Sequence, residues 1–415
     1  MKIAYETLGC KLSYSETSSF ARVLTQAGCE TVGIDEIADV YIINTCSVTE
    51  HADKKCRNMI RRMHKNNPDA RIIVTGCYAQ LQPDIIRGIE GVYAVVGADY
   101  KHRVTDIVLN GLHPGENNIL SGSYQDSKSF FPAYSSGERT RSFLKVQDGC
   151  DYHCTYCTIP LARGDSRNPS IASLVAQAHK IAEDGIKEIV LTGVNTGDFG
   201  KTTGESFLDL LKALNDVEGI ERYRISSIEP NLLIPEIIDW IAAGNKFLPH
   251  FHIPLQSGCD KILKAMHRRY TTAMFAEKIA FIRSKMDYVF FGIDVIVGFP
   301  GETDEDFMTT YHFLEAIKPA FIHIFPYSRR SNTPAAQMKD QVQECIKTKR
   351  VQMLEDLCQM LHSDFYKANE GRQEQVLFES SIKGGQMFGY TRNYIRVERP
   401  FDSNLIGKVV EVTLP

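Results

Sequence analysis

SFLKVQDGCDYHCTYCTIPLARGDSR, residues 142–167, is the stretch from which the rest of this chain can be interpreted. An apolar run, 143–146, predicts the end of a strand, and a C-x3-C-x2-C array follows it: Cys150, Cys154 and Cys157. An iron–sulfur cluster binds thiolates at such spacings, whereas a zinc site needs four ligands. Three cysteines without an evident fourth would leave one iron of a 4Fe–4S cluster open to a substrate or cofactor. A zinc knuckle completed by His153 and a disulfide cluster are the alternatives.

Length and composition set the class of protein. The chain has 415 residues, enough for two or three domains, and its net charge is −4, so any contact with RNA must come from local basic patches. The N-terminus has no signal-peptide pattern, and the sequence has no apolar run of membrane-spanning length. Eleven cysteines in such a chain indicate metal or catalytic use. We therefore expect a cytoplasmic protein without membrane contact.

Residues 1–112 alternate strand and helix patterns, which predicts a small doubly wound parallel sheet of the α/β class. One helix is expected over 15–28, ending at a glycine. Three cysteines fall at the ends of predicted strands, in LGC, NTC and TGC: Cys10, Cys46 and Cys77. The carboxyl ends of parallel strands share one edge of a sheet, so these thiols are expected to converge there. Three unrelated core cysteines are the alternative.

Residues 113–141 are rich in Gly, Ser, Pro and Asn and lack periodicity, so they predict a linker. From residue 142 to residue 370, six strand patterns alternate with helix patterns, which predicts an open (βα)6 barrel. Chemistry in such barrels lies at the carboxyl ends of the strands. EIVLTGVNTGDFGKT, 188–202, approaches a phosphate-binding loop, but Asn195 stands where the first glycine is required. A nucleotide hydrolase is therefore disfavoured.

The tail, 371–415, has short strand patterns that predict a small antiparallel β-barrel. GYTRNYIRV, together with the later GKVVEV, resembles the TRAM module of RNA-modifying enzymes. Aromatic and basic residues alternate in it, a pattern suited to base stacking and phosphate contact: Tyr390, Arg392, Tyr394 and Arg396. A barrel that merely covers the catalytic domain is the alternative.

The cysteine array, with the aromatic Tyr156 before its last cysteine, resembles the radical S-adenosylmethionine superfamily. LGCKLSYSE, NTCSVTE and VTGCYAQ, upstream of that array, resemble the methylthiotransferase family within it, over essentially the whole chain. The resemblance implies two 4Fe–4S clusters. The auxiliary cluster would be held by Cys10, Cys46 and Cys77, and the radical cluster by Cys150, Cys154 and Cys157. S-adenosylmethionine would methylate sulfur at the first and be cleaved to a deoxyadenosyl radical at the second.

Polar residues at predicted strand ends and around the array are the expected S-adenosylmethionine contacts. The resemblance implies that role for Tyr156, Gly193, Asn195, Ser227, Glu229, Gln256, Arg268 and Asp294. Gly193 and Asn195 stand where many radical enzymes have Gly-Gly-Glu, which leaves the contact to the amino group open. For each strand-end residue a helix cap or turn is the structural alternative. Arg163 and Arg167, just after the array, are expected to contact RNA.

The motifs most resemble enzymes that methylthiolate C2 of N6-threonylcarbamoyladenosine at position 37 of tRNA. Methylthiolation of N6-isopentenyladenosine in tRNA is the runner-up, and modification of a ribosomal-protein aspartate comes third. A non-catalytic iron–sulfur RNA-binding protein is the alternative from another class. The expected partners are the tRNA anticodon stem-loop and a reductant protein such as flavodoxin or ferredoxin, with the enzyme acting as a monomer.

Overall fold

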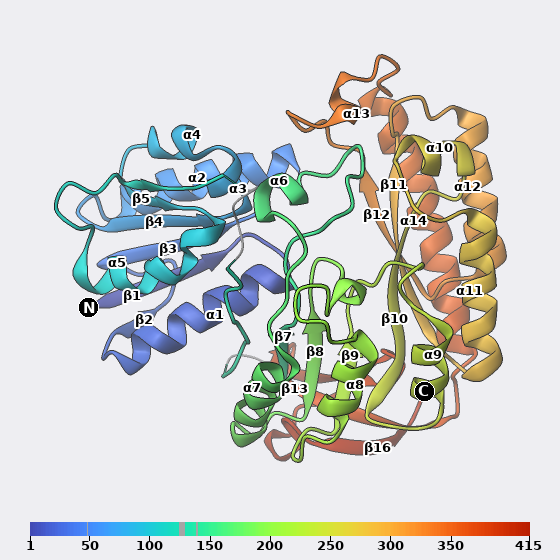
Figure 1. Cartoon of the computed structure of the whole chain (residues 1–415). Helices are drawn as coiled ribbons and strands as arrows, with labels where there is room; N and C mark the ends of the chain where they lie inside the picture. The colour runs from blue at the N-terminus through green and yellow to red at the C-terminus, as the bar shows by residue number, and fades with distance from the viewer. Residues whose placement is uncertain (48, 124–128, 138–139) are drawn as a thin grey trace.

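The computed structural model contains three sheets, with the N-terminal sheet beside a barrel and the C-terminal sheet below it in the view of Figure 1. It describes residues 1–47, 49–123, 129–137 and 140–415. Parallel strands with covering helices build the first two sheets, and antiparallel strands build the third. The predicted fold class is confirmed in all three parts, with the C-terminal sheet a half-barrel. The domain boundaries at residues 112, 141 and 370 stay predictions.

The N-terminal sheet is parallel and has the order β2-β1-β3-β4-β5-β6. Its strands are β1 (Lys2–Thr7), β2 (Glu30–Val32), β3 (Val40–Thr45), β4 (Arg71–Gly76), β5 (Val92–Val96) and β6 (Ile119–Leu120). Its helices are α1 (Lys11–Gln26), α2 (Glu50–Asn66), α3 (Cys77–Leu81), α4 (Pro83–Arg87), η1 (Ala98–Arg103) and α5 (Val104–Asn110). β3 is buried along its whole length, as expected of a central parallel strand covered on both faces.

Two features of this part differ from the sequence prediction. Helix α1 begins at Lys11, one turn before the expected start, because Cys10 takes the extended N-cap conformation and Leu12 is already buried in the first turn. The predicted linker is also not purely connecting chain, since β6 pairs in parallel with β5 through Val95 and Ile119. Residues 124–128 and 138–139 of that linker lie outside the described residues.

The barrel sheet has six parallel strands in the order β12-β11-β10-β9-β8-β7, so each strand lies beside its neighbour in the chain. They are β7 (Arg141–Lys145), β8 (Glu188–Thr192), β9 (Arg222–Ile225), β10 (Phe247–Gln256), β11 (Phe290–Val297) and β12 (Phe321–Pro326). The helices are α6 (Ile159–Arg163), α7 (Ile171–Glu183), η3 (Thr196–Asp198), α8 (Phe207–Asn215), α9 (Pro235–Ala242), α10 (Asp260–Ala265), α11 (Thr272–Lys285), α12 (Asp304–Ile317), α13 (Pro334–Gln337) and α14 (Glu344–Lys367).

The main hydrophobic core lies between this sheet and its outer helices. On β10 the alternate residues Phe251, Ile253 and Leu255 join the core that α7, α8, α9 and α11 cover. His250 and His252, on the same strand, therefore face the barrel interior, because successive side chains of a strand point to opposite faces. The helices thus close the outside of the barrel, and its inner face carries both polar and aromatic side chains.

The C-terminal sheet is antiparallel, with the order β15-β14-β13-β16. Its elements are β13 (Gln373–Lys383), β14 (Gln386–Thr391), β15 (Arg396–Pro400), η4 (Ser403–Leu405) and β16 (Val409–Thr413). Two arginines of β9 fasten this sheet to the barrel: Arg222 donates to the carbonyl oxygens of Gln375 and Tyr390, and Arg224 donates to those of Thr391 and Arg392. No helix in the described part of the chain is both long enough and apolar enough to cross a bilayer.

Candidate functional site

Three cysteines follow three adjacent strands of the N-terminal sheet. Cys10 is the N-cap of α1, just beyond β1, Cys46 follows β3 directly, and Cys77 follows β4 and opens α3. Strands β1, β3 and β4 are neighbours in the sheet. A Cβ atom built on Gly9 would lie 3.9 Å from the Cβ of Cys46, so the β1 loop lies against the end of β3. The predicted placement at one edge of the sheet is confirmed, and cluster binding there stays a prediction.

Gly76, before Cys77, is a residue whose role the sequence reasoning missed. Its φ is +99°, and a Cβ atom there would lie 2.4 Å from the carbonyl oxygen of Thr45 and 2.6 Å from Oδ1 of Asn44. Any larger residue would push the end of β4 away from β3, because backbone cannot yield at such distances. The TGC motif therefore needs its glycine to bring Cys77 beside Cys46. The signal in the sequence was a glycine directly before a cysteine at a predicted strand end, a position where positive φ is often required.

The loop at residues 150–157, which we call the radical loop, holds its three cysteines in one small apolar cluster. Cys150 and Cys154 are buried there with Tyr152, and Cys157 is half-buried beside them. The backbone N–H of Tyr152 donates to Sγ of Cys150, and that of Ile159 donates to Sγ of Cys157, both at 3.4 Å. Burial raises the pKa of the Cys157 thiol to about 12, and the thiol of Cys154 acts in the same direction. Donors aimed at sulfur in an apolar setting suit thiolates held by a metal.

A charged pair lies against the second cysteine of this loop. Nη1 of Arg268 donates to Sγ of Cys154 at 3.0 Å, and Nη2 of Arg268 forms an ion pair with Glu229. Desolvation raises the pKa of Glu229, although the guanidinium of Arg268 opposes that shift. Asn195 joins the group, because its Oδ1 accepts from the backbone N–H of Glu229 at 3.2 Å and its Nδ2 is buried without a partner among the described residues. Arg268, Glu229 and Asn195 therefore form a polar group of side chains beside Cys154.

A second group of predicted cofactor residues lines a cavity of about 190 Å³ beside Cys157: Tyr156, Gln256 and Asp294. Tyr156 also packs edge-on against Phe299, with ring centroids 6.4 Å apart. The other two predicted cofactor residues, Gly193 and Ser227, contact neighbouring protein groups. A Cβ atom on Gly193 would meet the side chain of Gln147 at 3.0 Å, and the carbonyl oxygen of Ser227 accepts from Thr196. The predicted cofactor residues thus fall into three places. Some join the charged cluster at Cys154, some line the cavity beside Cys157, and two pack against neighbouring protein groups.

Arg163 and Arg167 are not available to RNA, and the prediction for them is wrong. Their exposed fractions are 2% and 5%. Arg163 reaches back from α6 into an ion network, where its Nη1 lies 2.9 Å from Asp148 Oδ1 and 3.3 Å from Glu16 Oε1. Nε of Arg167 donates to the carbonyl oxygen of Ser129 at 2.7 Å. Guanidiniums this deep are held by acids and carbonyls, and the sequence could not distinguish that use from phosphate contact.

Arg163 also indicates that an anionic group suits the N-terminal cysteines. Its Nη2 is buried and has no hydrogen-bond partner among the described residues. The guanidinium interacts electrostatically with the thiols of Cys77 and Cys10. A buried cationic N–H without an acceptor is costly unless an anion occupies the adjoining site. A cluster held by three thiolates supplies such a negative group, so the residues present fit it.

A cavity of about 700 Å³, the large cavity, is lined by residues of both the N-terminal sheet and the barrel. At one end lie Gly9, Cys10 and Lys11, and at the other lie inward-facing residues of the barrel strands. The described lining contains four cationic side chains and no acidic one: Lys11, Arg141, Arg224 and Arg396. Aromatic rings make up much of the remainder: Tyr14, Phe143, Phe290, Phe321, Tyr366, Tyr390 and Tyr394. This cavity can take a flat, uncharged ring together with a negatively charged group.

Lys11 is the lining cation with no ion pair or hydrogen bond among the described residues. Arg141 lies 2.7 Å from Glu379, Arg224 lies 2.7 Å from Glu188, and Arg396 lies 3.2 Å from Glu398. Desolvation lowers the pKa of Lys11, and the guanidiniums of Arg141 and Arg224 act in the same direction. Sequence reasoning missed Lys11 because its place in the cavity depends on α1 beginning directly after Cys10.

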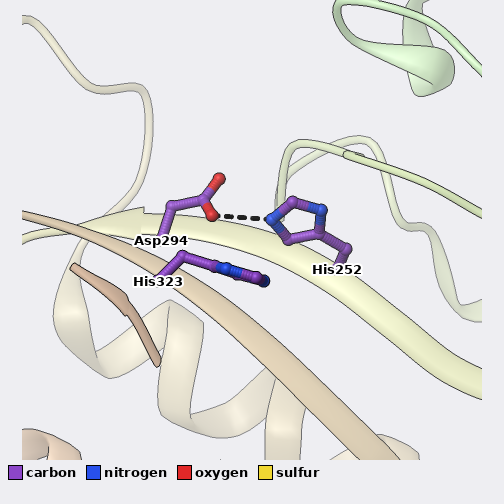
Figure 2. Close-up of side chains that lie close together, drawn as sticks. All are labelled: His252, Asp294 and His323. Carbon is purple, nitrogen blue, oxygen red and sulfur yellow. Dashed lines mark hydrogen bonds and ion pairs between the residues drawn. The ribbon is translucent and has the colours of Figure 1, made fainter. Parts of the chain in front are cut away.

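Three neighbouring barrel strands place His252, Asp294 and His323 side by side, as Figure 2 shows. Their ligating atoms lie within 4.8 Å of one another, and Nε2 of His252 is 2.7 Å from Oδ1 of Asp294. Desolvation lowers the pKa of His323, and His252 and Lys11 act in the same direction. A nearby ammonium disfavours a divalent cation, so we interpret the group as a hydrogen-bonded pair with a neutral neighbour. In the sequence, the alternation of apolar residues with His250 and His252 along β10 was the pattern that predicts inward-facing histidines.

The four predicted RNA residues of the C-terminal sheet separate into two pairs. Tyr390 and Tyr394 stack with ring centroids 4.7 Å apart and line the large cavity, where Arg141 lies over both rings. Arg392 and Arg396 are exposed. The aromatic residues therefore point inward, toward the barrel, whereas both basic residues are exposed and Arg396 also lines the cavity. Base stacking and phosphate contact by these residues stay predictions.

Comparisons with known proteins agree with this arrangement. Residues 2–97 match the family described as "Uncharacterized protein family UPF0004", and residues 144–314 match "Radical SAM superfamily". The chain is 40% identical over 427 residues to the threonylcarbamoyladenosine tRNA methylthiotransferase MtaB of Bacillus subtilis, covering 99% of this chain and 93% of that protein. It is 33% identical to the tRNA-2-methylthio-N(6)-dimethylallyladenosine synthase of Natranaerobius thermophilus, covering 98% of this chain and 93% of that protein.

Among solved structures, the radical S-adenosylmethionine methyltransferase TsrM of Kitasatospora setae has a similar fold. The TM-score is 0.59 at 14% sequence identity, and the match covers 80% of this chain and 76% of that one. At this identity the likeness concerns the fold alone. It extends beyond the barrel, since the barrel match at 144–314 is the smaller part of the chain.

Proposed function

The chain belongs to the radical S-adenosylmethionine methylthiotransferase family, and from that premise we propose that it places a methylthio group on C2 of N6-threonylcarbamoyladenosine at position 37 of tRNA. Relatives named for this nucleoside share 36–40% of their residues with the chain over nearly its full length. Relatives named for dimethylallyladenosine share 31–33%. That second nucleoside is therefore the alternative substrate.

One observation carries the proposal: a lining residue of the cavity beside Cys10 is hydrogen-bonded to a lining residue of the cavity beside Cys157. The small cavity lies beside Cys157 and includes Asp294, whereas the large cavity lies beside Cys10 and includes His252. Those two side chains are 2.7 Å apart. A nucleoside base in the large cavity would therefore have the N-terminal cysteines on one side and the radical loop on the other. A reaction that joins sulfur to a carbon radical requires both centres to reach one base.

S-adenosylmethionine and a 4Fe–4S cluster are the cofactors of this enzyme class, and when bound they supply the radical and the methyl group. We propose Cys150, Cys154 and Cys157 as ligands of the radical cluster and Cys10, Cys46 and Cys77 as ligands of a second cluster. Arg268 and Glu229 would contact the charged end of S-adenosylmethionine, because they are the buried ion pair at Cys154. Tyr156, Gln256 and Asp294 would surround its nucleoside end in the small cavity.

The residues of the large cavity would bind and orient the substrate base and exclude water. Phe290 stacks on His250 with ring centroids 5.1 Å apart and meets Tyr394 edge-on at 5.5 Å. These rings form a continuous aromatic wall on which an adenine can stack. Burial keeps His250 neutral by lowering its pKa, and Arg224 acts in the same direction. The wall thus offers a stacking surface without adding another charge.

The remaining assignments belong to the same proposal. The anticodon stem-loop would lie along the C-terminal sheet, with Arg392 and Arg396 near its phosphates, because both side chains are exposed and Arg396 also lines the large cavity. A flavodoxin or ferredoxin would supply electrons, and the enzyme would act as a cytoplasmic monomer. Residues 1–112, 142–370 and 371–415 would serve as the sulfur-carrying, radical and RNA-binding domains.

The test is nucleoside mass spectrometry of tRNA from a strain that lacks this gene, before and after the gene is restored. We expect the methylthio derivative of N6-threonylcarbamoyladenosine to disappear and return. Disappearance of the methylthio-isopentenyladenosine instead would keep the reaction and change the substrate. No change in either nucleoside would contradict the proposal and favour the ribosomal-protein aspartate or a role in RNA binding without catalysis.

A further inference from the structure

We propose that Lys11 binds the carboxylate of the substrate's amino-acid substituent and thereby selects a charged N6 group over an uncharged one. The inference rests on the proposed function, since it deepens the substrate assignment of the same cavity. Threonine joined through its amino nitrogen to a carbamoyl group keeps a free carboxylate. A dimethylallyl group carries no charge. The two substrates therefore differ in the one chemical property that Lys11 can read.

The charge distribution of the cavity supports an anion. Among the described lining residues four side chains are cationic and none is acidic. The acids that neutralise Arg141 and Arg224, Glu379 and Glu188, are not part of the lining. Lys11 forms no ion pair among the described residues, and Asp294, the acid that interacts with it electrostatically, is not part of the lining, so its ammonium is the one available to a ligand. Three of the four cations are already engaged, which identifies Lys11 as the binding group.

The local fold fixes Lys11 in this position. It is the first residue of α1, a helix of 16 residues, and no side chain caps the N–H groups of the first turn. The first turn cannot shift away from the cavity, because Leu12 is buried with 3% exposure and Ser13 lies against Gly9. The positive end of the helix therefore adds to the charge of the ammonium at the cavity wall.

The aromatic wall and Lys11 lie on different elements of the same cavity. Phe290 and Tyr394 belong to the barrel and the C-terminal sheet, whereas Lys11 belongs to the N-terminal sheet. A base stacked on the wall could thus direct a substituent on N6 toward Lys11. Lys11 is exposed to water in the free protein, so an uncharged substituent that displaced this water would leave the ammonium without an acceptor, and such an unmet group is penalised.

The experiment measures dissociation constants for anticodon stem-loop RNA carrying N6-threonylcarbamoyladenosine and for the same RNA with the carboxylate converted to its methyl ester. The protein is the cluster-loaded full chain without S-adenosylmethionine, so the readout is binding. For the unchanged protein we expect the acid to bind about 10-fold to 100-fold more tightly than the ester. Lys11→Met and Lys11→Gln should bind the two RNAs alike, and Lys11→Arg should keep part of the preference.

Lys212→Met is the matched control, because Lys212 is an exposed lysine on α8, outside the cavity. It should retain the full preference. Iron content and cluster spectra are recorded for each variant. If Lys11→Met does not take up its clusters, Lys11→Gln and Lys11→Arg serve as the test instead. A preference retained by the Met and Gln variants, or absent from the unchanged protein, overturns the inference.

The outcome separates this inference from the proposed function. If the unchanged protein methylthiolates the threonylcarbamoyl RNA while the Lys11→Met and Lys11→Gln variants still prefer the acid, only the role of Lys11 is wrong. In a second outcome, the unchanged protein prefers the acid and the Lys11→Met and Lys11→Gln variants lose that preference, but the unchanged protein forms no methylthio product. The carboxylate site then stands and the proposed function fails.

Discussion

Arg163 and Glu16 join the radical loop to the N-terminal sheet, with Nη1 of Arg163 3.3 Å from Oε1 of Glu16. Arg163 lies on α6, six residues after Cys157, and Glu16 lies on α1, six residues after Cys10. Both side chains are buried, and Lys145 and Lys101 contact the same carboxylate at 2.9 and 2.7 Å. Desolvation disfavours the charged carboxylate, but Lys101, Lys145 and Arg163 hold the pKa of Glu16 far below its usual range.

Arg163→Met should destabilise the chain, because it removes one member of this buried ion network. Loss of one partner from a buried charge group costs about 3–5 kcal/mol. The guanidinium also interacts electrostatically with Cys77 and Cys10, so the variant should retain less iron at the N-terminal cysteines. Thermal unfolding and iron per chain check both effects. Arg163→Lys keeps the charge and should lose less of each. Equal stability and equal iron in the Met variant would contradict the assignment.

Cys154→Ala should abolish deoxyadenosine formation, because it removes a proposed ligand of the radical cluster. Iron should fall from about eight to about four atoms per chain, since the N-terminal cysteines keep theirs. Chromatographic assay of deoxyadenosine and iron analysis measure the two quantities. Cys345→Ala is the matched control, since Cys345 is exposed on α14 and outside both cysteine sets. Undiminished cleavage by Cys154→Ala would rule out its role as a ligand.

Cys46→Ala should give the opposite pattern. Cleavage of S-adenosylmethionine should continue, because Cys150, Cys154 and Cys157 are intact. Methylthiolated product should be lost, since the sulfur path is proposed to run through the N-terminal cysteines. Mass spectrometry of the tRNA nucleosides and the deoxyadenosine assay are performed on the same sample. A full yield of methylthiolated nucleoside from this variant would end the proposal of two clusters.

Arg392→Gln should weaken tRNA binding without affecting cleavage of S-adenosylmethionine. Arg392 is exposed on the C-terminal sheet, beside the residues that line the cavity. Loss of one phosphate contact should reduce the slope of log affinity against log salt by about 0.7 to 0.9. Titrations at several salt concentrations measure that slope, and Lys212→Met should leave it unchanged. An unaltered slope for Arg392→Gln would place the RNA elsewhere.

Glu302 should make stability depend on pH near pH 5 to 6. Desolvation raises the pKa of this buried carboxyl from 4.5 to about 6, against the opposing hydrogen bond from the N–H of Gly298 and the charge of Arg350. The folded chain then binds the proton more tightly than the unfolded chain, so the contribution of Glu302 to stability falls as pH rises through this window. A shift of this size corresponds to about 2 kcal/mol.

Thermal unfolding of the unchanged protein and of Glu302→Gln between pH 4.5 and 7 tests this dependence. The stability of the unchanged protein relative to the Gln variant should decline as pH rises, because glutamine does not titrate. Parallel curves for the two proteins would show that Glu302 has an ordinary pKa in the folded chain.

Local sequence determined the two cysteine sets and the order of the sheets. The spacing of Cys150, Cys154 and Cys157 and the position of Cys10, Cys46 and Cys77 at strand ends are properties of short segments, as are the strand and helix periodicities. The alternation of residues along a strand and the glycine before a cysteine are patterns that involve only a few neighbouring residues. Such features can be read without knowing which distant segments meet.

Tertiary structure decided the use of each charge. The sequence pattern of Arg163 and Arg167 suggested RNA contact, but burial against Asp148, Glu16 and backbone carbonyls gives them a structural role. Lys11 gained its place only because α1 begins directly after Cys10 and the barrel lies opposite. Whether a charged side chain meets water, an acid or a ligand depends on which segments the fold brings together, and these can be as far apart in the chain as Arg163 and Glu16, so the local sequence does not show the outcome.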